Sequence, residues 1–193
     1  VNLMFIQERV GSEAFYTNLL ARRNALYTIS ERGRDLPLAV GTRALPTTSV
    51  NKGVWVLHML RWLMYDLETG TDDSFRAFLK EMSGAVIGPD FTNADFVALA
   101  EKHFGGSLAP FFHYWLYGTG LPEFDVEYGI EHAGAEYFVN VDVANKTADE
   151  SFRMPVIFRI VTPDQVTFAR QLIRGRADHF RIGPFASSPT EVY

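Results

Sequence analysis

Hydrophobic residues in the first two thirds of the chain recur at three and four positions, the spacing of a helix face. Ser12 precedes an acidic residue and can cap the first helix that we predict. Arg22 and Arg23 lie away from the apolar face of this helix, and we interpret them as solvated surface. The apolar face is predicted to consist of Phe15, Leu19 and Leu26.

The most apolar segment is residues 54–64, VWVLHMLRWLM. Nine of its eleven residues are apolar, which leaves no wide polar face. We therefore predict a central helix that begins at Ser49 or Asn51 and is buried on most sides. Residues 31–49 contain two glycines and two prolines, which indicates an irregular connection of the length that often carries function.

Three further helices are predicted from their capping residues. Asp72 and Asp73 begin one of them, and we interpret both as caps rather than as an acid/base pair. Thr92 with Asp95 three residues later is typical of a capping box. Ser107 is predicted to cap the last helix.

After residues 118–122, GTGLP, the hydrophobic period changes to two. Alternation over residues 137–143, 152–161 and 166–182 predicts about five short strands with no helix between them. Such a run of strands indicates an antiparallel sandwich rather than a parallel sheet. Pro155 predicts that its strand lies at an edge, because proline cannot donate to a neighbouring strand.

These patterns predict an α+β protein of two domains. The first, residues 1–121, is an all-α helical bundle, and the second, residues 122–193, is a small antiparallel β-sandwich. The chain starts inside an apolar stretch, and residues 191–193 resemble the first residues of a strand, so we expect a segment of a longer protein. The sandwich is then expected to be truncated at its last strand, residues 191–193.

Composition excludes several classes of function. The chain has 193 residues, of which 47% are hydrophobic and 21% charged, an ordinary globular blend. The absence of cysteine excludes a thiolate metal site and a cysteine nucleophile. A net charge of −5 argues against non-specific binding to nucleic acid or anionic membranes. No run reaches the ~20 apolar residues of a membrane span, and the compartment (periplasmic, secreted or cytoplasmic) remains open.

The five histidines do not have the spacing of a metal site, because no H-E-x-x-H motif places two of them on one helix face. We interpret His58, beside Arg61 in the most apolar helix, as a hydrogen-bonded core or rim histidine. His113 is interpreted as a packing residue, and His132 and His179 as solvated. The sequence thus predicts no metal ligand and no cofactor within residues 1–193.

Several segments resemble one enzyme family in the same order along the chain. Residues 51–61, NKGVWVLHMLR, resemble the segment of gluzincin zinc aminopeptidases of the membrane alanyl (aminopeptidase N) type that runs Y-x-K-G and then an apolar helix ending M-L-R. Residues 73–79 and 91–96 resemble the next two helices of that family. Residues 108–122 resemble its F-F-x-x-W-L helix and G-x-P exit, and residues 11–15 the helix just past its third zinc ligand.

The resemblance implies the C-terminal part of a catalytic domain, followed by the family's sandwich domain. In the family layout the zinc-binding helix precedes Val1, so this segment is expected to be inactive alone and to pack against the missing zinc-binding half. The parent is expected to be a zinc-dependent aminopeptidase with a peptide substrate. Val50 occupies the position of the family's catalytic tyrosine, so no catalytic residue is assigned here. Losing one such hydrogen-bond donor to an oxyanion typically costs ~100- to 1,000-fold in rate.

Two alternatives remain open: a non-catalytic protein-interaction scaffold derived from the same family, and a generic helical domain with a β appendage. An H-E-x-x-H motif upstream of Val1 would favour the enzyme, and broken ligands the scaffold. If the family register holds, Val50 is expected to be more exposed than Val56, a valine within the same helix.

Overall fold

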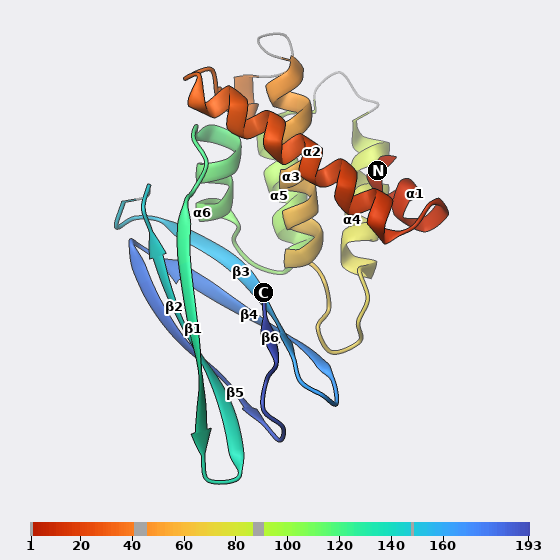
Figure 1. The fold of residues 1–193 in the computed structure, drawn as a ribbon. Coiled ribbons are helices and arrows are strands. Elements are labelled where there is room, and N and C mark those ends of the chain that lie inside the picture. The colour runs from red at the N-terminus through yellow and green to blue at the C-terminus, as the bar shows by residue number, and fades with distance from the viewer. Residues whose placement is uncertain (1, 41–45, 87–90, 148) are drawn as a thin grey trace. The chain divides into compact units, whose positions relative to one another are not determined.

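The computed structural model describes residues 2–40, 46–86, 91–147 and 149–193 (Figure 1). The chain divides into two compact units, Val1–Leu121 and Pro122–Tyr193. The described helices lie in the first unit and the strands in the second, so the protein is α+β with the two-part layout that the sequence predicts. None of the described helices is both long and apolar enough to span a bilayer.

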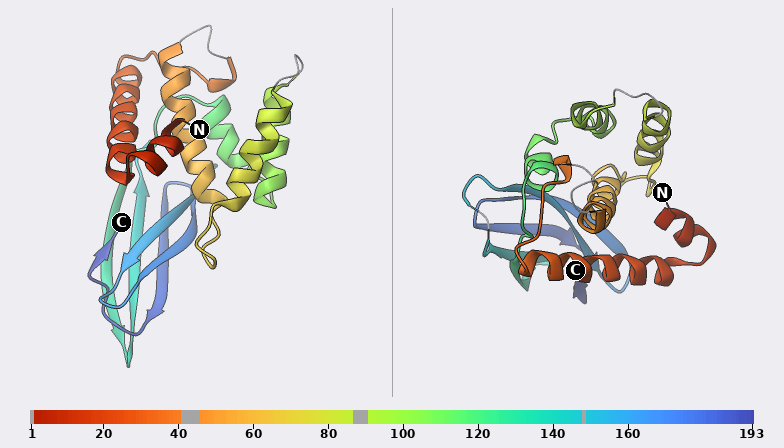
Figure 2. Two further views of the ribbon diagram at one scale, coloured as in Figure 1. Left: turned by 90° about the vertical axis from the view of Figure 1, so that its right-hand side faces the viewer. Right: turned by 90° about the horizontal axis from the view of Figure 1, so that it is seen from above.

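Helices α2 and α3 lie side by side in the first unit, as do α4 and α5 (Figure 2). The preceding helix, α1, packs against α2. A 3₁₀ turn, η1, follows α2, and a π-helical turn, η2, continues α6. The bounds of these elements are α1 Asn2–Arg9, α2 Ser12–Glu31, η1 Leu38–Val40, α3 Pro46–Leu63, α4 Asp73–Ala85, α5 Asn93–Phe104, α6 Ala109–Phe112 and η2 His113–Tyr117.

The core of the helical unit follows the helical periodicity of the sequence. On α2 the predicted face of Phe15, Leu19 and Leu26 is buried. No residue of α3 from 51 onward is exposed, as its apolar composition predicts. Phenylalanine rings connect α4, α5 and α6 through contacts of 5.3–5.8 Å between centroids, which are Phe75–Phe78, Phe78–Phe96, Phe96–Phe112 and Phe111–Phe112.

The predicted helix starts agree with the structure at α5 and differ at α2 and α3. Thr92 and Asp95 form the predicted capping box, in which each side chain accepts from the other's backbone N–H. At α2 the cap is Gly11, and Ser12 makes no capping hydrogen bond. Helix α3 begins at Pro46, earlier than predicted, because proline suits a first helical turn where its missing N–H needs no partner. At α6 the N-cap position is Leu108, but the Ser107 hydroxyl accepts the Ala109 N–H at 3.2 Å, so Ser107 caps the start of this helix as predicted.

The second unit contains two three-stranded antiparallel sheets, with strand orders β1-β2-β5 and β4-β3-β6. Val139, Val141 and Val143 of β2 are buried, as are Phe158 and Ile160 of β3. The Phe158 ring lies 5.9 Å from that of Phe180 in the other sheet, so the sheets share a core. The strand bounds are β1 Phe124–Ala133, β2 Glu136–Asn145, β3 Arg153–Val161, β4 Val166–Arg174, β5 Ala177–Phe185 and β6 Glu191–Val192.

The prediction that Pro155 marks an edge strand is wrong, because β3 lies between β4 and β6. The register explains how proline is accommodated. Arg159 and Tyr193 exchange both backbone hydrogen bonds, at 2.9 and 3.0 Å, so alternate residues of β3 direct their backbone groups toward β6. Pro155 is one of these residues, and β6 pairs only with Ile160 and Val161. The missing N–H therefore removes no hydrogen bond to β4.

Thr92 caps α5, whereas Ser12 makes no capping hydrogen bond, so removing their hydroxyls should have different effects on stability. Thr92→Ala should lower the free energy of unfolding by about 1 kcal/mol, because it removes the hydroxyl that accepts from the Asp95 N–H. Ser12→Ala is the matched control and should change it by less than about 0.5 kcal/mol, since Ser12 caps nothing. Urea unfolding of both variants measures the difference. Equal losses in the two variants would contradict these cap assignments.

Candidate functional site

Lys52 of α3 has no exposed surface, which is rare for a lysine. Its ammonium donates to Asp35 Oδ2 at 3.2 Å and to the Gly118 carbonyl at 3.0 Å. A buried charge is tolerated only when it is paired and hydrogen-bonded. These contacts therefore fix Lys52 in the interior of the helical unit.

Asp35 joins three segments that are distant in the sequence. Besides binding Lys52, its Oδ2 accepts the Gly120 N–H at 2.7 Å. The carboxylate thereby ties the segment after α2 to α3 and to the exit from η2. Its other oxygen, Oδ1, is buried and has no hydrogen-bond partner among the described residues. We call Lys52, Asp35, Gly118 and Gly120 the buried lysine cluster.

A second polar contact lies one residue earlier on α3, between it and α2. Arg22 donates to the Asn51 side-chain carbonyl at 3.1 Å, so Arg22 is not the solvated surface residue that the sequence predicts. Arg22 Nε and Trp55 Nε1 are buried donors for which the described part of the chain supplies no acceptor. Each unsatisfied buried donor costs about 1–3 kcal/mol. This part of the α2–α3 interface therefore has more buried hydrogen-bond donors than acceptors.

Val50 lies two residues before Lys52 and is half exposed, at 50%, whereas Val56 is 2% exposed. The difference has the direction expected from the sequence. An aliphatic side chain offers no hydrogen bond to a ligand, so Val50 can contribute contact area and nothing else. Its correspondence to a catalytic tyrosine remains a prediction from the resemblance.

His58 is packed between aromatic rings rather than hydrogen-bonded to any described residue. Its imidazole lies 5.4 Å from the Phe15 ring and 5.7 Å from the Trp55 ring. Burial, and then the charge of Arg61, lower the pKa of His58 to about 4. His58 is therefore neutral at pH 7, consistent with a core role.

The other histidines do not converge on a common site. His113 is exposed, so the prediction that it packs in the interior is wrong; it lies at the start of the π turn η2. His132 and His179 are exposed, as predicted. No group of three or more possible metal-ligating side chains occurs in the described ranges. Three of the histidines contact different partners: His103 contacts Glu81 at 2.9 Å, His179 contacts Asp142 at 2.8 Å, and His132 stacks on Tyr137.

Asp72 precedes α4 but makes no capping hydrogen bond through its side chain, contrary to the sequence prediction. Instead it binds Arg61 and Arg76, each at 2.6 Å. Burial alone would raise its pKa, but hydrogen bonds from Arg76 and Arg61 outweigh it and lower the pKa of Asp72. The same arginines reach Gln7 and Glu8, so this network ties α1 to α3 and α4.

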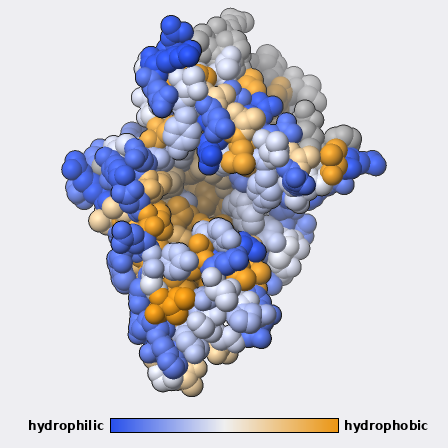
Figure 3. Space-filling model, in the orientation of Figure 1, coloured by the Kyte–Doolittle hydropathy of each residue, from blue (hydrophilic) through white to orange (hydrophobic). Residues whose placement is uncertain are grey.

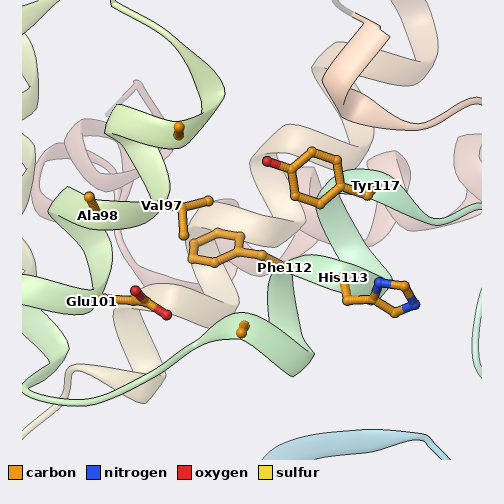
Figure 4. Close-up of a pocket in the computed structure, with 8 residues that line it drawn as sticks. Val97, Ala98, Glu101, Phe112, His113 and Tyr117 are labelled. Atoms are coloured by element: carbon orange, nitrogen blue, oxygen red, sulfur yellow. The ribbon is translucent and has the colours of Figure 1, made fainter.

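A groove of about 550 Å³ lies between α5 and the α6–η2 segment. Figure 4 shows Val97 beside Phe112 in its centre, with the Tyr117 ring nearby and the His113 imidazole directed away from Glu101. The Glu101 carboxylate already accepts the Leu108 N–H at 2.7 Å. The groove thus contains no acid/base pair and is a poor catalytic site.

Comparison with known proteins leaves the family of this chain open. No family model matches it, and no curated protein does. Among solved structures it is similar to aminopeptidase A of Legionella pneumophila in complex with aspartic acid, with a TM-score of 0.49 and 17% sequence identity. The alignment covers 77% of this chain and 17% of that protein, so the chain spans a small part of that aminopeptidase. This likeness assigns no function to any residue.

In the sequence, Lys52 stands out only as part of the N-K-G motif, and no motif includes Asp35. A lysine at the start of an otherwise apolar helix was the available signal, because such a residue must either reach solvent or find a counter-charge. The carboxylate that pairs with Lys52 could not be predicted in this way, since the sequence contains many aspartates and glutamates that could be the counter-charge.

Removal of the Asp35 carboxylate should strongly destabilise the helical unit. Asp35→Ala is expected to lower the free energy of unfolding by about 3–5 kcal/mol, because it leaves the Lys52 ammonium buried without a counter-charge. Glu8→Ala removes an exposed ion pair to Arg76 and should cost less than about 1 kcal/mol. Urea denaturation measures both. A loss for Asp35→Ala no larger than for Glu8→Ala would refute the role of the cluster.

His58 should make stability depend on pH. The unfolded chain binds a proton at a pKa near 6.5 and the folded chain at about 4, so the unfolded state holds more protons between these values. Stability is therefore lost as pH falls through this window, by on the order of 2–3 kcal/mol. His58→Phe keeps the aromatic packing and should remove this part of the pH dependence. Denaturant unfolding at several pH values would contradict the assignment if both proteins showed the same slope.

Proposed function

We propose that this chain is the non-metal-binding helical part of a zinc aminopeptidase-like protein of the gluzincin type, together with the β unit that follows it. The support comes from five motifs in the family's order and from one contact between two of them. Lys52 belongs to the K-G motif, and Gly118, 66 positions later, begins the segment 118–122 that resembles the G-x-P exit. Their hydrogen bond joins the two motifs in one buried cluster, as segments of a single domain require.

In this proposal the peptide substrate and the zinc belong to the longer protein. The described residues do not fit a zinc site, since no three candidate ligands gather among them. We therefore assign no metal-dependent step to this chain. Its role is structural: α3, held by the buried lysine cluster, presents Val50 on an exposed surface where the rest of the domain would pack.

A second candidate is a non-catalytic scaffold for protein binding, and Val50 favours it. A tyrosine at this position would supply a donor to developing negative charge, and valine supplies none. The longer protein is then expected to bind peptides without rapid turnover, because a donor used in the transition state contributes little to substrate binding.

Restoring the phenol at residue 50 in the longer protein separates the two candidates. Val50→Tyr should raise kcat for an aminoacyl 4-nitroanilide at least about tenfold, with a smaller change in KM, if the remaining site is intact. Val50→Phe is the matched control, since it adds the ring without the hydroxyl, and should give no such gain.

Four outcomes decide the proposal. Residues 1–193 alone, supplied with zinc, should hydrolyse no anilide, and turnover by this segment would overturn the division of roles. A rapid wild-type enzyme that gains nothing from Val50→Tyr would show that Val50 does not stand at the tyrosine position. A gain confined to the tyrosine variant supports the enzyme, and a folded, peptide-binding variant that stays inactive supports the scaffold.

A further inference from the structure

Strand β1 is the outer strand of its sheet, and no described residue pairs with its outer edge. Figure 3 shows hydrophobic side chains among hydrophilic ones over the β unit. Three apolar side chains of β1 are 46–51% exposed, although their partners in register on β2 are 0–2% exposed. These pairs are Val126 with Val143, Tyr128 with Val141, and Ile130 with Val139. The core-facing side of the sheet therefore ends in an uncovered apolar stripe.

The backbone N–H and C=O groups of Val126, Tyr128 and Ile130 also point away from β2, toward the open edge. Lys146 donates its N–H to the Glu123 carbonyl at 2.9 Å, which fixes the phase of the β1–β2 ladder. Residues of an antiparallel strand alternate in the direction of their backbone groups, so Val126, Tyr128 and Ile130 direct theirs away from β2. The outer edge thus offers both hydrogen bonds and apolar contact at the same positions.

The opposite side of β1 is acidic, and one of its carboxylates lacks a cation. Asp125 binds Lys146 at 2.8 Å, and Glu131 binds Arg181 at 3.0 Å. Glu127 has no ion pair or hydrogen bond with any described residue. In register it lies directly opposite Asp142, and like charges opposite one another destabilise a sheet. A positive charge beside Glu127 would relieve this repulsion.

We propose that the outer edge of β1 binds an extended segment of a partner protein by strand addition. In the partner segment, apolar and polar residues alternate. The apolar residues cover Val126, Tyr128 and Ile130, and a lysine or arginine among the polar ones lies beside Glu127. A strand added to an open edge gains main-chain hydrogen bonds, and alternate side chains give specificity. By contrast, the open part of the β3 edge carries Pro155, which limits strand addition there.

A second copy of this chain is the less suitable occupant. Strand β1 brings three carboxylates and no lysine or arginine to an added strand, so pairing of two β1 strands would increase the acidic charge on that side. The chain as a whole carries a net charge of −5. Charge complementarity thus selects a basic partner strand. This inference does not depend on the proposed function.

Two synthetic peptides test the proposal on the whole chain: one alternates valine with lysine, the other valine with glutamate. The lysine peptide should bind saturably and slow amide hydrogen exchange at Val126, Tyr128 and Ile130. Glu127→Lys should weaken it about fivefold and strengthen the glutamate peptide to a similar extent. Glu127 is exposed, so this variant should fold. Equal binding of both peptides to wild type, or no binding, would overturn the proposal.

A backbone variant tests the hydrogen-bonding edge separately from charge. Tyr128→Pro removes an outward N–H without removing a bond to β2, and should weaken the lysine peptide at least about tenfold. Glu127→Gln is its control and should weaken binding only modestly. Protection of the same three amides by self-association, without peptide, would instead identify a second copy as the occupant and contradict the proposal.

Discussion

The buried ammonium of Lys52 is the constraint on which the helical unit depends. A charge with no exposed surface requires partners, and these come from residues 17 and 66 positions away. The chain must therefore bring the segment after α2 and the exit from η2 to the same side of α3. The directed hydrogen bonds of the cluster help to fix the positions of these segments.

This constraint also links the fold to the proposed function. The K-G and G-x-P motifs are separate in sequence, and the lysine makes them one structural feature. Val50 lies beside that feature but is exposed, so the rigid start of α3 holds in place a residue that carries no chemistry of its own. Under the proposed function, an aliphatic residue at this position suits a protein whose catalysis is weak or has been lost.

Much of the fold could be predicted because its signals are local. The spacing of Phe15, Leu19 and Leu26 defines a helix face, the Thr92–Asp95 pair defines a cap, and the change of period marks the start of the strands. The errors came from contacts between distant segments. Strand β3 becomes central through two residues at the end of the chain. Asp72 resembles a cap in sequence but pairs with Arg76 in the next turn and with Arg61 of the preceding helix.

The candidate site was harder to predict for the same reason. Nothing local to Asp35 distinguishes it from other carboxylates, and its choice depends on the path of the intervening loop. Strand β1 (Phe124–Ala133) lies before the alternation from which the strands were predicted, although its own apolar residues also alternate. Both faces of β1 are largely exposed, so its sequence lacks the run of buried apolar residues by which a strand is recognised.

The most direct measurement is the hydrogen-exchange rate of the Gly120 amide, which donates to Asp35 within the buried lysine cluster. If the cluster holds the helical unit together, the hydrogen bond of this amide breaks only when the unit unfolds. Its protection from exchange should then match that of core amides of α3 such as Leu60. Exchange at the rate of a freely exposed amide, with Leu60 still protected, would contradict the account.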